Sequence, residues 1–154
     1  MRKLTFLTLL LAVLALATGG RAGVAPLDFV YITGELTITE VTEDMVYGDL
    51  TGDVVGDFEA VIVGSEEYEL PFGTVVVLFT ESLIITEDGT ITMEDIIYTV
   101  PIGGSGISYW VGQHDINGGT GAFEDAFGGI LTRGVVPPEG PIMLGYYGLV
   151  GIPE

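Results

Sequence analysis

The 154-residue sequence has no cysteine, one histidine, one tryptophan and only four lysine or arginine residues. Without cysteine, the chain can form neither a disulfide framework nor a thiolate metal site. The single histidine, His114, cannot make a histidine-rich metal site, and no Gly-x-Ser-x-Gly segment supplies a serine nucleophile. We therefore expect neither a metal ion nor a cofactor, and we interpret His114 as a hydrogen-bonded structural residue.

Two of the four basic residues, Arg2 and Lys3, stand at the very start of the chain. They precede residues 4–17, which are apolar except for two threonines and end in the small-x-small pattern of Ala15 and Ala17. This arrangement predicts a secretory signal peptide over residues 1–17, with Ala22 as a second possible cleavage site. The run is shorter than the ~20 residues that span a bilayer, so we expect a secreted protein without a stable membrane anchor.

Cleavage would leave an extension over residues 18–27 and one domain over residues 28–154. This mature chain would keep two arginines, Arg21 and Arg133, against 22 carboxylates, a formal charge near −20. Such a charge repels nucleic acids and anionic membranes, which excludes both as partners. The acidity fits either a solvating shell or adaptation to high salt. Asp49, Asp53 and Asp57 follow one another every four residues, whereas a calcium-binding EF-hand loop has its acidic residues at alternate positions.

Nearly every segment of the mature chain alternates apolar and polar residues, as strands do, and no helical period extends over ten residues. Residues 65–69 are acidic and predict a loop before Pro71-Phe72-Gly73, and Asp88-Gly89 predicts a hairpin turn. About eight strands separated by turns indicate an all-β fold, a closed antiparallel β-barrel or, failing that, a sandwich. The expected strands cover residues 28–38, a strand followed by a short turn within 48–57, and residues 57–63, 74–86, 90–100, 107–117, 129–136 and 142–150.

Two of these strands have unusual patterns. Residues 74–86 are partly apolar on both faces, which predicts a strand buried on two sides and therefore a homo-oligomer, a dimer or trimer. In residues 90–100 the apolar phase shifts from odd positions (Ile91) to even positions (Ile96) around Glu94 and Asp95. Such a shift predicts a β-bulge at Glu94-Asp95.

The segment of residues 118–128 contains four glycines interrupted by alanines and phenylalanines. A phosphate-binding loop would need a lysine and a helix after the glycines, and neither follows. The pattern instead predicts a tight structural turn whose side chains cover a neighbouring core. The residues of this turn are Gly118, Gly119, Thr120, Gly121, Phe123, Ala126 and Gly128.

Residues 118–128, with the pattern Gly-Gly-Thr-Gly-x-Phe-x-x-Ala-x-Gly, resemble the signature of dirigent proteins and of bacterial relatives of allene oxide cyclase. The Gly-Asp-Leu-Thr-Gly pattern of residues 48–52, the Asp88-Gly89 hairpin and the final Tyr147-Gly148-Leu149 are similar too. The resemblance implies an eight-stranded barrel with an apolar cavity, often trimeric, and any enzymatic activity would be that of a cyclase or isomerase. The residues that guide chemistry in the plant proteins have no matching motif here.

Glu81 is the most informative polar residue, because it lies in phase with apolar residues of its strand. If this face lines a cavity, Glu81 is a candidate catalytic acid or base. If the face points to solvent, or if Glu81 pairs with Arg133, the residue is structural. Five aromatic residues are candidates for lining a ligand pocket, since they combine a large apolar area with, in most of them, a polar tip: Tyr31, Tyr47, Phe79, Tyr98 and Trp110.

These observations support two hypotheses. In the first, a secreted barrel binds a small apolar molecule in its interior and steers its cyclisation or coupling. In the second, the chain is a non-catalytic structural or assembly protein of the cell exterior. An open interior of a few hundred Å³ favours the first hypothesis, and a filled interior favours the second.

Overall fold

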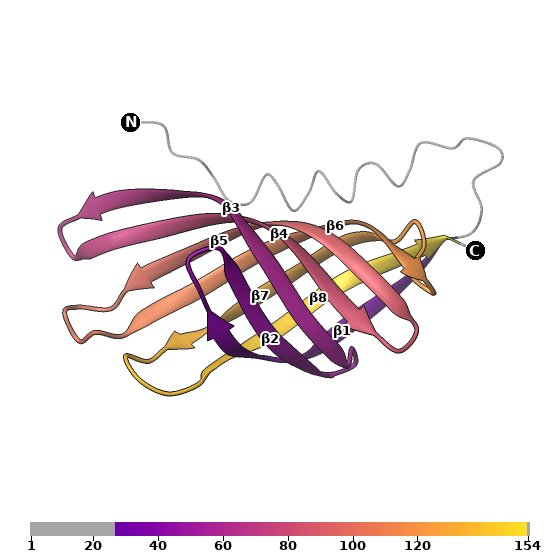
Figure 1. Cartoon of the computed structure of the whole chain (residues 1–154), viewed down its shortest axis with the longest axis horizontal. Coiled ribbons are helices and arrows are strands. Elements are labelled where there is room, and N and C mark those ends of the chain that lie inside the picture. The colour runs from indigo at the N-terminus through magenta and orange to yellow at the C-terminus, as the bar shows by residue number, and fades with distance from the viewer. Residues whose placement is uncertain (1–26, 154) are drawn as a thin grey trace.

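The computed structural model describes residues 27–153, and all eight of its regular elements are β-strands (Figure 1). The predicted signal peptide and nearly all of the predicted extension lie outside the described residues. The strands are β1 (Leu27–Val41), β2 (Met45–Gly52), β3 (Gly56–Leu70), β4 (Gly73–Thr86), β5 (Gly89–Pro101), β6 (Ser108–Gly121), β7 (Phe127–Val136) and β8 (Ile142–Pro153).

Each strand pairs antiparallel with its neighbours in sequence, and β1 pairs with β8, so the sheet closes into a barrel. The closing ladder is long and runs without a register shift from Leu27 opposite Pro153 to Ile38 opposite Ile142. The predicted eight-stranded antiparallel barrel is confirmed, and the sandwich alternative is wrong because a sandwich would leave unpaired edges. Short connections favour pairing between consecutive strands, which accounts for every ladder except the one between β1 and β8.

The barrel interior is a continuous apolar core. Alternate residues of a strand point to opposite faces of the sheet, so one set of each strand faces inward. An eight-stranded barrel is just narrow enough for such side chains to fill it. The inward set includes Leu36 of β1, Leu50 of β2, Phe58 of β3, Ile84 of β4 and Leu144 of β8, each at most 4% exposed.

The two ends of the barrel differ. At one end, on the left of Figure 1, the β3–β4, β5–β6 and β7–β8 hairpins extend beyond the barrel. The other end has the tighter turns and the end of β8. The turn of residues 122–126, between β6 and β7, belongs to the tighter end. Ala126 there is buried and Phe123 packs against the core. The predicted turn is therefore shorter than expected. Only Phe123 and Ala126 of its seven residues lie in the turn, which covers this end of the barrel, while the others belong to strands: Gly118, Gly119, Thr120 and Gly121 to β6, and Gly128 to β7.

The sequence-based strand pattern needs two corrections. Residues 65–69 form no loop, because β3 continues through them to Leu70, opposite Gly73 of β4. Pairing with an apolar strand here overrides the low strand propensity of an acidic segment. The predicted phase shift in β5 is also wrong: Asp95 points inward with Met93 and Ile97, while Ile96 and Tyr98 point outward. The bulge near this point lies at Thr92/Met93, and the unpaired residue belongs to β6.

Candidate functional site

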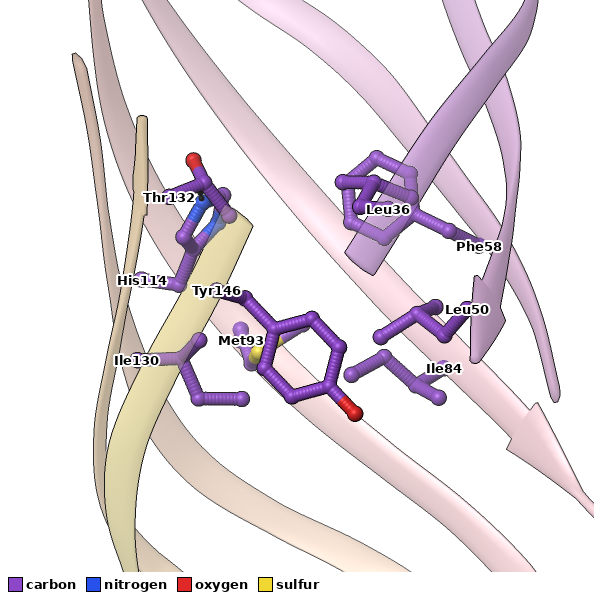
Figure 2. A pocket seen from close by; sticks show the side chains of 9 residues that line it. All are labelled: Leu36, Leu50, Phe58, Ile84, Met93, His114, Ile130, Thr132 and Tyr146. Carbon is purple, nitrogen blue, oxygen red and sulfur yellow. Dashed lines mark hydrogen bonds between the residues drawn. The ribbon is translucent and has the colours of Figure 1, made fainter. Parts of the chain in front are cut away.

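The barrel interior is filled by side chains. Figure 2 shows the ring of Tyr146 reaching from β8 into the middle of the barrel, with Leu36 and Phe58 on one side and His114 and Thr132 on the other. The cavity between these side chains has a volume of only ≈ 10 Å³, which accommodates about one water molecule. No organic ligand fits there. By the criterion set above, the filled interior favours an assembly protein over a barrel that binds its ligand inside.

A polar network nevertheless crosses this apolar interior. Thr80, Asp95 and His114 lie directly opposite one another on β4, β5 and β6, and all three are buried. Asp95 Oδ2 accepts a hydrogen bond from Thr80 Oγ1 at 2.7 Å, and Asp95 Oδ1 lies 2.9 Å from His114 Nδ1. The last two atoms are within ion-pair distance, but their geometry is not that of a hydrogen bond, and neither has another partner among residues 27–153. Asp95 and His114 therefore depend on each other.

The network continues to β7 through the other nitrogen of the imidazole. His114 Nε2 lies 2.9 Å from Thr132 Oγ1, which also accepts a hydrogen bond from Trp110 Nε1 at 3.1 Å. Gly112 makes this close approach possible, because a Cβ atom there would lie 2.4 Å from Thr132 Oγ1. The order carboxylate, imidazole, hydroxyl is that of a hydrolase triad. The cavity beside these groups has a volume of only ≈ 10 Å³, and their contacts join β4, β5, β6 and β7 inside the barrel.

Tyr146 of β8 makes hydrogen bonds with the β2–β3 turn. Its hydroxyl accepts a hydrogen bond from the backbone N–H of Val54 at 3.0 Å and donates one to the Val54 carbonyl at 3.1 Å. Both backbone groups of a buried residue are thereby satisfied by one side chain, as burial requires. Burial raises the pKa of Tyr146, while the hydrogen bond with Val54 opposes that rise. These hydrogen bonds hold the β2–β3 turn over the tighter end of the barrel, where the turn between β6 and β7 also lies.

The structure does not gather the five predicted ligand residues at one place. Trp110 is the one that points inward, where it belongs to the polar network. Phe79 and Tyr98 lie on the outer surface of β4 and β5. Tyr31 is 60% exposed on β1, and Tyr47 alternates with buried neighbours on β2 and so points outward too. The interior pocket that these residues were expected to share is absent from the described part of the chain.

Glu81 also lies on the outer face. It is exposed and stands between Val61 of β3 and Glu94 of β5, and Glu94 in turn stands opposite Asp115 of β6. No ion pair joins Glu81 to Arg133 in residues 27–153. Arg133 lies on β7 instead, 5.4 Å from the centre of the Tyr147 ring. The solvent-facing alternative is thus the one that the structure shows for Glu81.

We predict that Glu81→Gln changes the free energy of unfolding by no more than about 0.5 kcal/mol, since an exposed and unpaired side chain contributes little. Any change should be an increase in stability, because the substitution removes one of two carboxylates that stand opposite each other on β4 and β5. Urea unfolding midpoints of the two proteins test this. A loss of more than 1 kcal/mol would mean that Glu81 has a buried partner.

A hollow of ≈ 420 Å³ lies on the outer surface of β3, β4 and β5. Val77 forms its floor and is only 6% exposed although it points outward. The Tyr68 hydroxyl donates a hydrogen bond to Glu66 Oε2 at the rim, and this hydrogen bond raises the pKa of Tyr68. The volume falls in the range of about 300–1,000 Å³ typical of small-molecule pockets. The lining residues are Glu66, Tyr68, Leu70, Val75, Val77, Phe79, Ile96 and Tyr98.

The apolar surface continues from this hollow onto the neighbouring strands. Register places Tyr98 opposite Val111 of β6, and places Leu131 and Val135 of β7 in the next rows. We call the outward apolar side chains of β5–β8 the outer apolar face; its exposed members are Ile96, Tyr98, Val111, Leu131, Val135, Met143 and Leu149, each 36–50% exposed. Gln113 and Arg133 interrupt this face, since they stand opposite Leu131 and Val111. A large share of exposed apolar surface on one side marks interaction sites in soluble proteins.

Residues 27–153 contain neither a candidate metal site nor a candidate membrane-spanning helix. No group of three or more His, Asp or Glu side chains is arranged there to hold a metal ion, and Asp53 Oδ2 accepts a hydrogen bond from the Thr33 N–H instead. Within the same residues, no helix is long and apolar enough to cross a membrane.

Comparison with known proteins gives little further guidance. No protein-family model and no curated protein sequence matches the chain. Among solved structures, the structure of a pterocarpan synthase dirigent protein aligns over 89% of this chain and 94% of that chain, with 14% sequence identity and a TM-score of 0.32. A TM-score of this size carries no argument about function. The barrel assignment rests on the strand pairing of this chain itself.

Proposed function

We propose that this chain is an exported, non-catalytic assembly barrel that associates with copies of itself through the outer apolar face. The observation that carries the proposal is the exposed apolar surface of β5–β8, of which Val135, Met143 and Leu149 are each about half exposed. Burying such surface against a second copy removes it from water, which is the main driving force of association. The filled interior supports a role outside the barrel.

The remaining parts of the proposal rest on the sequence. The predicted signal peptide supports an extracytoplasmic location, and the formal charge near −20 of the mature chain argues against nucleic acids and anionic membranes as partners. High net charge also opposes self-association, so we expect the oligomer to be favoured by salt. A dimer or a trimer is the expected assembly.

A substitution of Leu131 tests the proposal, because this residue lies on β7, one of the two middle strands of the outer apolar face. We expect wild-type protein at micromolar concentration to have the mass of a dimer or trimer by light scattering, and Leu131→Asp to weaken association at least about tenfold, equivalent to about 1.4 kcal/mol. Val55→Asp is the matched control, since Val55 is 68% exposed in the β2–β3 turn, outside this face.

Wild-type protein that remains monomeric under these conditions, with and without added salt, would contradict the assembly proposal. The second candidate function would then stand alone. In that function the hollow on β3–β5 binds a small apolar molecule, and the specific observation in its favour is the aromatic lining by Tyr68, Phe79 and Tyr98 around the buried floor at Val77. A ligand of this kind would bind outside the barrel, and nothing in the hollow indicates that it reacts.

A further inference from the structure

The second half of β3 has one side without a partner strand. Strand β2 pairs with β3 only from Leu50 opposite Gly56 to Met45 opposite Val61. The Ile62 N–H still donates a hydrogen bond to the Asp44 carbonyl. Beyond that point β3 continues to Leu70, paired with β4 alone among the described residues (Figure 1). We call residues 63–70 the β3 free edge; at roughly 3.3 Å per residue they offer about 26 Å of unpaired backbone.

This edge is exposed and acidic. Val63 is 57% exposed and Tyr68 is 50% exposed. Three carboxylates, those of Glu66, Glu67 and Glu69, lie within four successive positions, and no ion pair neutralises them within residues 27–153. The one arginine of those residues, Arg133, lies on β7. A free edge in a natural protein is commonly guarded by charges and by a bulge, and here the register shift at Ile62/Gly64 provides the bulge.

The charges guard the edge against one kind of partner only. Pairing two β3 free edges of separate copies would bring two sets of three carboxylates together, and like charges opposite each other destabilise a sheet. A strand with cationic side chains would instead gain from the same carboxylates. Charge therefore excludes a second copy at this edge and selects an extended basic segment.

The two faces of the edge differ in a way that specifies the pattern of such a segment. Glu67 and Glu69 stand opposite Val76 and Thr74 of β4, in phase with the inward-facing Leu78. Glu66 and Tyr68 lie on the other face, at the rim of the outer hollow. A strand added here would place basic side chains beside Glu67 and Glu69, and apolar side chains beside Tyr68.

We propose that the β3 free edge is a β-augmentation site for an extended segment of another protein in which lysine or arginine alternates with apolar residues. The backbone of residues 63–70 supplies the hydrogen bonds, the inward carboxylates supply the charge preference, and the hollow receives an apolar side chain. The backbone edge of residues 63–70 lies on β3, outside the outer apolar face of β5–β8, although the hollow shares Ile96 and Tyr98 with that face. Strand pairing at this edge therefore does not depend on self-association.

A synthetic peptide of about eight residues, with lysine alternating with valine, is the probe. We expect it to bind the wild-type protein and to slow the hydrogen exchange of alternate backbone amides within residues 63–70 at least about tenfold. A fully N-methylated copy of the peptide keeps its charges but has no backbone N–H donors, so it should bind at least about tenfold more weakly. The double variant Glu67→Gln/Glu69→Gln should weaken binding of the first peptide about threefold to tenfold.

The matched control is Glu87→Gln/Glu124→Gln, which removes two exposed carboxylates in the β4–β5 and β6–β7 turns and should leave binding unchanged. Equal binding of the N-methylated peptide would overturn the proposal, because attraction between charges would then be sufficient. Amide protection of residues 63–70 that rises with protein concentration in the absence of peptide would also overturn it, in favour of a second copy.

Discussion

Asp95→Ala should lower the free energy of unfolding by about 2–6 kcal/mol, because two buried polar groups lose their partner at about 1–3 kcal/mol each. The substitution would leave His114 Nδ1 and Thr80 Oγ1 without their partner in the buried interior of the barrel. Urea or guanidinium unfolding of wild-type and variant protein under identical conditions measures the difference. Glu94→Ala is the matched control, since this exposed carboxylate is the next residue along β5 and should change stability by no more than about 0.5 kcal/mol.

A triple variant distinguishes the loss of the polar contacts from the loss of side-chain volume. Replacing Asp95, His114 and Thr80 together by apolar residues of similar size should recover most of the lost stability, because neither His114 Nδ1 nor Thr80 Oγ1 would then remain buried without its partner. If Asp95→Ala costs no more than Glu94→Ala, Asp95 is not a stabilising part of the interior network. The network would then need a role in binding or chemistry to explain its presence.

Gly121→Val should be as damaging, for a different reason. Gly121 has φ 64°, a conformation that a β-branched residue adopts only at a cost of about 1–3 kcal/mol. A Cβ atom there would also lie 2.3 Å from the Asp88 carbonyl oxygen, and such overpacking costs about 1–3 kcal/mol more. We therefore expect a loss of about 2–6 kcal/mol, or a protein that fails to fold, measured as a fall in melting temperature.

Gly103→Val is the control for this prediction. Gly103 has a similar φ of 53°, but nothing lies within 4 Å of the position that its Cβ would take. The control variant should therefore show the conformational cost without the steric one. An unchanged melting temperature for Gly121→Val would show that the turn between β6 and β7 can adapt, and that this segment does not fix the tighter end of the barrel.

The barrel could be predicted because its signals are local. Alternation of apolar and polar residues, together with turn residues such as Asp88-Gly89, depends on a few neighbouring positions. Both errors arose where a contact distant in sequence decides the structure. Residues 65–69 read as a loop because they are acidic, yet pairing with β4 makes them a strand.

The position of Asp95 could not be predicted for the same reason. Its charge suggested a bulge, but a carboxylate can lie inside when a partner on another strand compensates for its burial. The partner is His114, which lies 19 positions away in the sequence and directly opposite in the sheet. An uninterrupted phase through Ile91, Met93 and Ile97, with Asp95 between them, was the available signal. The outer hollow had no such signal, since its lining residues meet only when β3, β4 and β5 pair.

The pairing of β1 with β8 has a consequence for how the chain reaches its structure. The other seven ladders join strands that are neighbours in sequence, so each can form as a hairpin with a short loop. The β1–β8 ladder joins Leu27 to Pro153 and requires the whole chain to be gathered first. Until that ladder forms, both terminal strands carry open edges that can pair with other molecules. Closure of the barrel is therefore the step at which folding competes with aggregation.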